Sequence, residues 1–325
     1  YEEYEKTAQD FALALMHVFQ DAAGQYAPGV LPVPVVTVPA GRGHNEGAFA
    51  FLHHVANAAL QLERIEVRGD YTPLMLPFQE ETLHAKEIVA QCVTLNLPRL
   101  AYALEEGGNF WSGLDSLFDV ATSSIAEKHQ FLSTLIARKK NGPYSLFSFQ
   151  HNHVSLADLE GAVYGLECCG LYECVALLQE SMPEESDTTT EEWMKAILSH
   201  LQKRCATWSE QMGVLLRVYP VHDTAVAERF AHIDFRYAHD LVKQVLPVAT
   251  DVYSLGVLKD TRTSEDYSAF EETLETLCKY LPWLQGGSVY VQCPSSDTTF
   301  PEQLSHTLAE FFSEHPGISL KLFNS

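Results

Sequence analysis

The chain has 325 residues, of which 46% are hydrophobic, and 43 acidic against 21 basic side chains give it a formal net charge of -22. This length suffices for a large α/β core, no apolar run reaches the length of a transmembrane helix, and the charge disfavours nonspecific binding to nucleic acid or to an anionic membrane. The seven cysteines are odd in number and include no CxxC pair. A disulfide framework is therefore not indicated, and we expect a cytoplasmic protein.

The first part of the chain alternates helices with short strands. An apolar stripe of Phe11, Leu15, Val18 and Phe19 predicts the first helix. Two prolines in the first strand-like run predict an edge strand or the end of a strand, because proline cannot donate to a central ladder. The predicted elements are helices Tyr4–Ala23 and Ala48–Gln61, strands Val30–Val38 and Arg64–Val67, a loop over Thr72–Phe78 and a short helix over Glu81–Lys86.

The stretch Val89–Trp111 organises the middle of the chain. It begins as an apolar run with β-branched residues, which predicts a buried strand. It breaks at Asn96-Leu97-Pro98-Arg99, where Pro98 biases Leu97 away from helix, and Gly107-Gly108 marks a turn. Apolar residues at steps of three and four then predict one long helix from Phe110 to Leu135.

The second half repeats the alternation of strand and helix. Strands separated by helices indicate βαβ units and a mainly parallel sheet. The predicted strands are Tyr144–Phe149, Ala162–Cys169, Val214–Tyr219, Ser288–Cys293 and Ile318–Phe323, and the predicted helices are Tyr172–Gln179, Glu191–Gln211, one after Asp223, Ser268–Tyr280 and Pro301–Ser313.

Few residues carry a chemical pattern. Cys168-Cys169 ends a predicted strand directly before a helix, where a thiol can be activated, but two cysteines in an apolar run are also typical of core packing. Arg99 and Arg229 could anchor an anion, although Arg229 lies in a run with Glu228 and Asp234 that favours a structural ion pair. No phosphate-binding glycine loop and no metal-ligand spacing is present, so we expect no cofactor and no metal.

Four segments stand in collinear order along the chain. The first holds Leu95-Asn96-Leu97-Pro98-Arg99, followed by Leu114-Asp115 and Lys128 in the long helix. The others read YGLECCGLYECVALL, RVYPVHDTAVAERFAHIDFRY and LQGGSVYVQC. Together these segments resemble the class III, or anaerobic, ribonucleoside-triphosphate reductases of the glycyl radical enzyme family. The resemblance covers residues 88–325 and is weak over residues 1–87, and it implies a single β/α barrel-like domain over residues 1–325, incomplete and with long surface helices.

The resemblance also implies a chemistry. In this family a glycyl radical near the C-terminus generates a cysteine thiyl radical, which abstracts the ribose 3′-hydrogen, and four cysteines bind a zinc ion. By resemblance, the substrate-binding positions are Asn96, Arg99, Tyr172 and His222. If the chain is active, the catalytic candidates are Cys168, Cys169, Cys92 and Glu173.

Departures from the family pattern shape the functional expectation. No zinc cysteines and no radical loop are visible before Ser325, and Arg68–Phe78 holds no cysteine where the family carries one. Tyr172 replaces an asparagine, Pro220-Val221-His222 replaces Pro-Ala-Glu, and Tyr253-Ser254 stands for a longer polar stretch. Because such chemistry requires close placement of each group, we expect a pseudoenzyme.

Three hypotheses remain open at this stage. The chain is a degenerate reductase that acts as a scaffold or as a subunit binding a partner or a nucleotide. Alternatively, it is an active reductase subunit with the glycyl loop supplied in trans, or an unrelated α/β binding protein. We expect a protein partner or a homo-oligomer, possible nucleotide binding, and neither nucleic-acid nor membrane binding.

Overall fold

The structure is a computed structural model that describes residues 2–23, 33–38, 46–62, 64–69, 88–104, 109–137, 150–151, 154–155, 162–181, 188–246, 252–258, 267–293 and 300–323. The helices are α1 (Glu2–Ala23), α2 (Glu46–Gln61), α3 (Leu97–Leu104), α4 (Phe110–Ala137), α5 (Leu171–Ser181), α6 (Thr190–Met212), α7 (Thr224–Tyr237), α8 (His239–Val245), α9 (Tyr267–Cys278) and α10 (Phe300–Glu314). The strands are β1 (Val35–Val38), β2 (Arg64–Gly69), β3 (Ile88–Asn96), β4 (Gln150–His151), β5 (Val154–Ser155), β6 (Ala162–Cys169), β7 (Leu215–Tyr219), β8 (Ser288–Gln292) and β9 (Ser319–Phe323). No helix in these ranges is both long and apolar enough to span a membrane.

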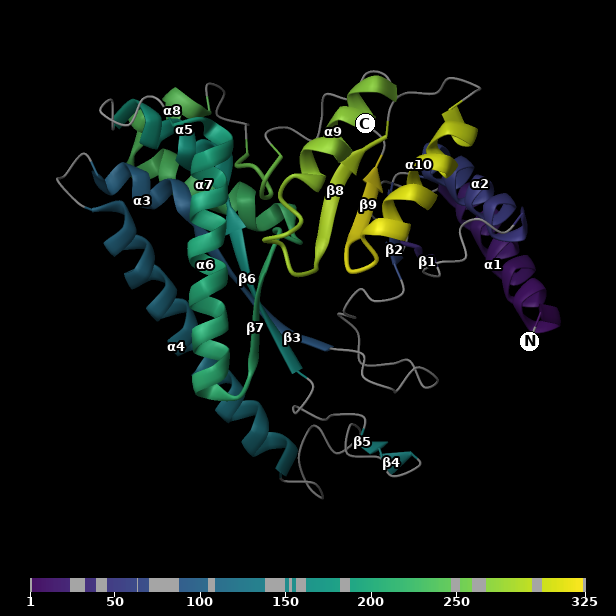
Figure 1. The fold of residues 1–325 in the computed structure, drawn as a ribbon, viewed down its shortest axis with the longest axis horizontal. Helices are drawn as coiled ribbons and strands as arrows, with labels where there is room; N and C mark the ends of the chain where they lie inside the picture. Colours follow the sequence, from purple (N-terminus) through teal and green to yellow (C-terminus); the bar gives the residue numbers. More distant parts are fainter. Residues whose placement is uncertain are drawn as a thin grey trace. The chain divides into compact units, whose positions relative to one another are not determined.

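The chain divides into two compact units (Figure 1). The first comprises Tyr1–Thr72, Asp260–Lys279 and Gly286–Ser325, and the second comprises Pro73–Lys259 and Tyr280–Gln285. The strands within the described ranges form separate open sheets. The mixed helix and strand content with parallel pairing agrees with the predicted α/β class, whereas barrel closure and a single domain over residues 1–325 stay predictions.

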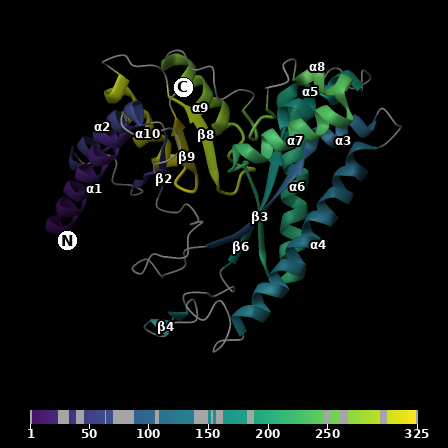
Figure 2. The ribbon, with the colours of Figure 1, turned by 180° about the vertical axis from the view of Figure 1, so that it is seen from behind.

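The first unit is built on a four-stranded sheet in the order β1-β2-β9-β8. β1 pairs parallel to β2, β2 antiparallel to β9, and β9 parallel to β8. Among the described strands β1 lies at an edge of this sheet, which is one of the two positions that the prolines predicted. Helices α2 and α10 pack against each other beside this sheet, and α1 packs on α2 (Figure 2). Its core includes Ile65, Val67, Leu320 and Leu322, all without measurable exposure at 0%.

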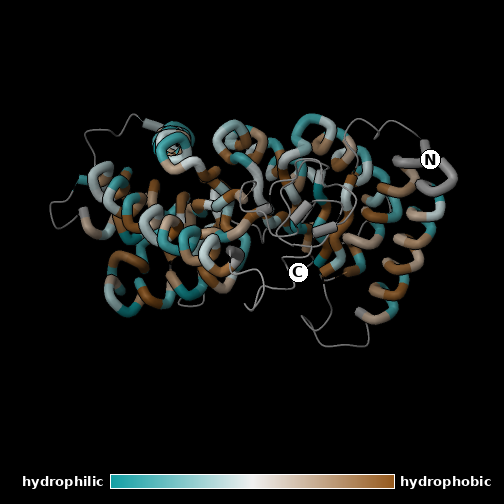
Figure 3. The backbone as a smooth tube through the Cα atoms, turned by 90° about the horizontal axis from the view of Figure 1, so that it is seen from below, coloured by the Kyte–Doolittle hydropathy of each residue, from teal (hydrophilic) through white to brown (hydrophobic). Residues whose placement is uncertain are grey.

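Helix α1 corrects one detail of the sequence interpretation. Phe11, Leu15 and Val18 are 70%, 46% and 62% exposed, whereas Met16 is 5% exposed. Helix α1 packs on α2, and Phe11, Leu15 and Val18 of the predicted apolar stripe lie outside the buried side of the helix. Figure 3 shows hydrophobic segments in brown and hydrophilic segments in teal within the same helices.

The second unit is built on the parallel sheet β3-β6-β7. Two long helices, α4 and α6, lie beside this sheet (Figures 1 and 2). On α4, His129 Nδ1 lies 3.0 Å from the Tyr164 hydroxyl of β6, so α4 lies on the face of the sheet to which Tyr164 points. Helices α3 and α5 begin directly after the carboxyl ends of the parallel strands β3 and β6, so both helices start at the same end of the sheet.

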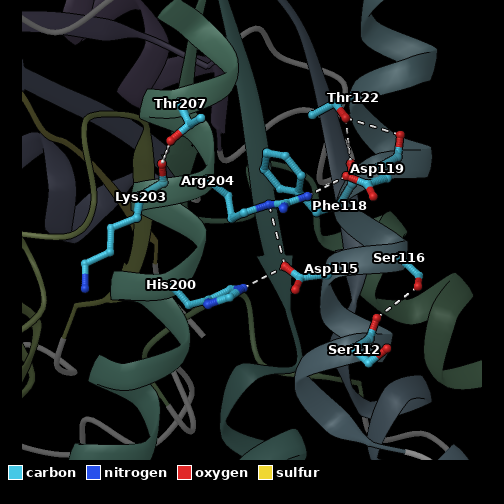
Figure 4. A network of polar contacts seen from close by, with 10 residues as sticks. All are labelled: Ser112, Asp115, Ser116, Phe118, Asp119, Thr122, His200, Lys203, Arg204 and Thr207. Atoms are coloured by element: carbon cyan, nitrogen blue, oxygen red, sulfur yellow. Dashed lines mark hydrogen bonds and ion pairs between the residues drawn. The ribbon is translucent and has the colours of Figure 1, made fainter. Parts of the chain in front are cut away.

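Helices α4 and α6 are joined by a polar network across their facing sides (Figure 4). Asp115 lies 2.8 Å from His200 Nε2, and the Arg204 guanidinium pairs with Asp115 and Asp119. The same guanidinium stands 4.8 Å from the centre of the Phe118 ring. These groups are partly exposed, so we assign them a role in helix alignment with a small stabilising effect.

The corner after β3 differs from the sequence expectation. Pro98 was expected to hold Leu97 outside a helix, but α3 begins at Leu97. Proline is tolerated in a first helical turn, because the backbone N–H that it lacks has no partner there. Four predicted features lie outside the described residues. They are the turn at Gly107-Gly108, the loop over Thr72–Phe78, the helix over Glu81–Lys86 and the strand Tyr144–Phe149, which ends directly before β4.

Candidate functional site

Strand register places polar side chains on one face of the β3-β6-β7 sheet. Thr94 pairs with Glu167, and Asn96 pairs with Cys169. Because side chains alternate along a strand and paired residues share a face, Cys92, Thr94, Asn96 and Glu167 lie together on what we call the polar face. Tyr164 and Cys168 point to the opposite face, which carries α4 and α6.

Glu167 is the centre of a first cluster on the polar face. Its carboxylate is 1% exposed and accepts a 2.6 Å hydrogen bond from Thr94 Oγ1. His222 Nδ1 contacts the other carboxylate oxygen. Cys92 Sγ completes the group, and one atom from each of Cys92, Glu167 and His222 lies within 4.8 Å of the others.

Asp234 on α7 is the centre of a second cluster. Its side chain is fully buried, at 0% exposed. It accepts hydrogen bonds from Asn96 Nδ2 at 2.8 Å, Arg99 at 2.8 Å and the Tyr253 hydroxyl at 3.1 Å. The Tyr253 hydroxyl also lies 2.9 Å from that of Tyr102. Burial, together with the Tyr102 and Asp234 groups, raises the pKa of Tyr253.

Glu173 in the first turn of α5 holds the segment around Ser254. Its carboxylate accepts from the Ser254 backbone N–H at 3.0 Å and from the Ser254 hydroxyl at 2.7 Å. In return, the Gly170 N–H donates to the Ser254 carbonyl at 2.9 Å. Tyr172 is half-buried beside Glu173. Glu173 therefore ties the start of α5 to the 252–258 segment.

The cysteines differ in direction and burial. Cys168 is 2% exposed and Cys169 0% exposed, and they point to opposite faces of β6. Cys92 is half-buried on the polar face. Burial raises the pKa of all three thiols, and nearby acidic groups add to the effect. None of these thiols is therefore activated as a thiolate at neutral pH.

Because of its buried thiols, the protein should lose free energy of unfolding at alkaline pH. Burial raises the pKa of Cys205 and Cys293 from 9.0 to about 12. Above pH 9 the unfolded chain loses these protons while the folded chain retains them, so the free energy of unfolding falls as pH rises from 9 towards 12. We expect a loss of about 1 kcal/mol per thiol at pH 10.

Urea unfolding of the wild type and of Cys205→Ala at pH 8 and pH 10 measures this effect. The difference in the free energy of unfolding between the wild type and Cys205→Ala should be about 1 kcal/mol smaller at pH 10 than at pH 8. An equal difference at both pH values would contradict a raised pKa of the Cys205 thiol.

The structure brings the sequence candidates together in pairs. Cys92 and His222 meet at Glu167, Asn96 and Arg99 meet at Asp234, and Glu173 stands apart at Ser254. The sequence interpretation assigned no role in the site to Glu167 or Thr94, although a charged residue inside the apolar run AVYGLECC could have drawn attention to Glu167. It also placed Asp234 with Arg229, whereas Arg229 instead stacks 5.6 Å from the Phe230 ring centre.

Comparisons with known proteins agree on one group. Residues 1–312 match the model of the family described as anaerobic ribonucleoside-triphosphate reductase. No curated protein matches the sequence.

Several solved structures share the fold. The anaerobic ribonucleotide reductase from Thermotoga maritima in complex with dATP and CTP has a TM-score of 0.64 at 12% identity, over 94% of this chain and 50% of that one. The same enzyme with citrate in the active site gives 0.61 at 12% identity, over 96% and 54%. A further anaerobic ribonucleotide reductase gives 0.59 at 13% identity, over 90% and 45%. The chain thus spans about half the length of these proteins.

Proposed function

This chain belongs to the anaerobic ribonucleoside-triphosphate reductase family, whose model covers residues 1–312, and from that premise we propose that it is a nucleotide-binding subunit without radical catalysis of its own. Its scaffold is of the β/α barrel type. We also propose that residues 1–325 form a single barrel-like domain. Residues 1–87 are its weakly matched part, and residues 88–325 are its reductase-like part. A partner chain or a second copy would complete the assembly.

The observation that carries the proposal is the internal pairing of the candidate site. Asn96 and Arg99 bond to Asp234, and His222 bonds to Glu167. A thiol that abstracts hydrogen from a ribose must contact the sugar, yet Cys168 and Cys169 are 2% and 0% exposed. Groups held in this way can shape a binding surface without taking part in hydrogen abstraction.

Arg99 is the residue that we assign to the nucleotide. Its side chain is 48% exposed although Asp234 fixes one end of the guanidinium. A guanidinium presents five N–H donors, so the remaining ones can face a phosphate. A related solved structure is described as a complex with dATP and CTP, which makes these two nucleotides the first probes.

Calorimetric titration of the purified chain with CTP and dATP, beside an anaerobic reduction assay, tests the proposal. We expect binding of at least one nucleotide, binding at least tenfold weaker in Arg99→Gln, and no deoxyribonucleotide product. Arg236→Gln, at an exposed arginine of α7, should bind as the wild type does. Ribonucleotide reduction by the activated chain alone would reject the absence of catalysis, and failure to bind either nucleotide would reject the binding role.

One observation favours a second candidate, an active subunit whose glycyl loop comes from another chain. Cys92 is half-buried on the polar face beside Glu167 and His222, so a docked loop could reach it. Replacement of Cys92, Cys168 and Cys169 by alanine should then abolish activity of the reconstituted complex. Full activity in this triple variant would eliminate the second candidate.

A further inference from the structure

Three different metal-binding side chains converge on the polar face, and we propose that Cys92, Glu167 and His222 form a site for a divalent transition metal of the zinc type. Metal binding at these residues is separate from nucleotide binding and does not depend on it. The three donors are a thiol sulfur, a carboxylate oxygen and an imidazole nitrogen, which is the set that Zn²⁺ uses in proteins.

The three ligand atoms are already close to coordination distance. They lie within 4.8 Å of one another. Tetrahedral Zn²⁺ with bonds of about 2.0–2.3 Å holds its ligand atoms about 3.5 Å apart. Small rotations about side-chain bonds therefore suffice to bring all three onto one ion, with the His222–Glu167 contact opening to admit it.

The backbone explains why the sulfur can take this position. Gly165 is the residue that pairs with Cys92 across β3 and β6. A Cβ atom at Gly165 would come within 2.6 Å of Cys92 Sγ. The missing side chain thus makes the room in which the sulfur lies next to Glu167. Any larger residue at this position would push the thiol away from the other two ligands.

The carboxylate is also oriented by a neighbouring group. Thr94 Oγ1 donates to one oxygen of Glu167 at 2.6 Å, and His222 contacts the other. Hydrogen bonds of this kind fix the orientation of a metal ligand and strengthen metal binding. Because the Glu167 side chain is 1% exposed, an ion bound there would be a partner for a carboxylate that is otherwise held away from water.

Solvent access defines the kind of site. The His222 side chain is 36% exposed, so the cluster opens to solvent on the histidine side. Zinc sites with four protein ligands are structural, whereas sites with three leave a position for water or another ligand. The proposed site has three ligands and belongs to the second kind.

Cobalt titration of the full chain, reduced and freed of metal by a chelator, provides the test. We expect one Co²⁺ per chain with a thiolate-to-cobalt charge-transfer band, which Zn²⁺ abolishes by displacement. Cys92→Ser should lose the band and weaken binding at least 100-fold, and Thr94→Val should weaken it about tenfold. Cys278→Ser changes the other half-buried cysteine among those described and should bind as the wild type does.

A second measurement covers the case in which Cys92→Ser does not fold. In the wild type, Zn²⁺ should slow alkylation of Cys92 at least tenfold, as measured by mass spectrometry of the labelled peptide, and should leave Cys278 unaffected. Absence of the charge-transfer band, a band that persists in folded Cys92→Ser, or equal alkylation of Cys92 with and without Zn²⁺ would overturn the proposal.

Discussion

Asp234→Ala is expected to lower the free energy of unfolding of the second unit by about 3 kcal/mol, because three donors lose one buried acceptor. Asp234 is 0% exposed and accepts from Asn96, Arg99 and Tyr253 at 2.8–3.1 Å. A hydrogen bond to a charged group contributes about 1.5–3 kcal/mol. Removing one partner of a buried pair costs about 3–5 kcal/mol. We choose the lower end because the Arg99 side chain, 48% exposed, can turn to water.

Urea unfolding followed by tryptophan fluorescence is a direct measurement of this loss. All four tryptophans, Trp111, Trp193, Trp208 and Trp283, belong to the second unit, so the fluorescence change reports on that unit. Asp234→Asn keeps one acceptor oxygen and should lose about half as much.

The matched control is Asp240→Ala. Asp240 lies close in sequence on α8, but its side chain is 100% exposed and contacts only His239 among the ion pairs found in the described residues. We expect a change within about 0.5 kcal/mol. A loss for Asp234→Ala as small as that of the control would mean that the Asp234 cluster does not hold α3, α7 and the 252–258 segment together.

The elements that the sequence predicted well are those specified by local pattern. Helix α6 is an example, because its periodic apolar residues lie between a capping box at Thr189 and a left-handed Gly213. The closing run of β8, α10 and β9 agrees with prediction to within two residues at each end. In both cases the residues that begin and end an element lie directly beside it in the sequence.

The site was less predictable because its partners are distant in sequence. Arg99 bonds to Asp234 over 135 positions, and His222 meets Glu167 over 55. A single sequence offers no means of pairing such residues, so Asp234 was placed with its near neighbour Arg229. The resemblance to a known family located the segments, and only the register of β3 and β6 showed which side chains share a face.

A similar limit applies to α1. Its apolar residues follow a helical period, and the helix forms as predicted. Which side becomes buried depends on where α2 packs, and that contact leaves Phe11 and Val18 exposed. Periodicity therefore predicted the helix α1 but not which of its sides packs on α2.

Gly170→Ala is expected to lower the stability of the second unit by about 3 kcal/mol, since two independent costs meet at this position. Gly170 has a φ of +69°, which a residue with a Cβ adopts at a cost of about 1 kcal/mol. A Cβ there would also lie 2.4 Å from Cγ and 2.6 Å from Cδ of Pro98. The proline ring is rigid, so relief requires backbone movement, and such overpacking costs about 1–3 kcal/mol.

Gly213→Ala separates the two costs. Gly213 has nearly the same φ, +66°, but no atom lies within 4 Å of the position that a Cβ would occupy. It should therefore lose only the conformational part, about 1 kcal/mol. The difference of about 2 kcal/mol between the two variants measures the contact between Gly170 and Pro98, with tryptophan fluorescence again as the readout.

A double-mutant cycle assigns that difference to its source. If the Pro98 ring causes the excess, Pro98→Ala should recover most of it in the Gly170→Ala background, and the two substitutions should be non-additive by at least 1 kcal/mol. Equal losses for Gly170→Ala and Gly213→Ala would instead show that the start of α5 does not need close contact with the corner after β3. Non-additivity would identify this contact as the reason that a glycine must follow Cys169, because it fixes the distance between the first turns of α3 and α5, where Arg99 and Glu173 lie.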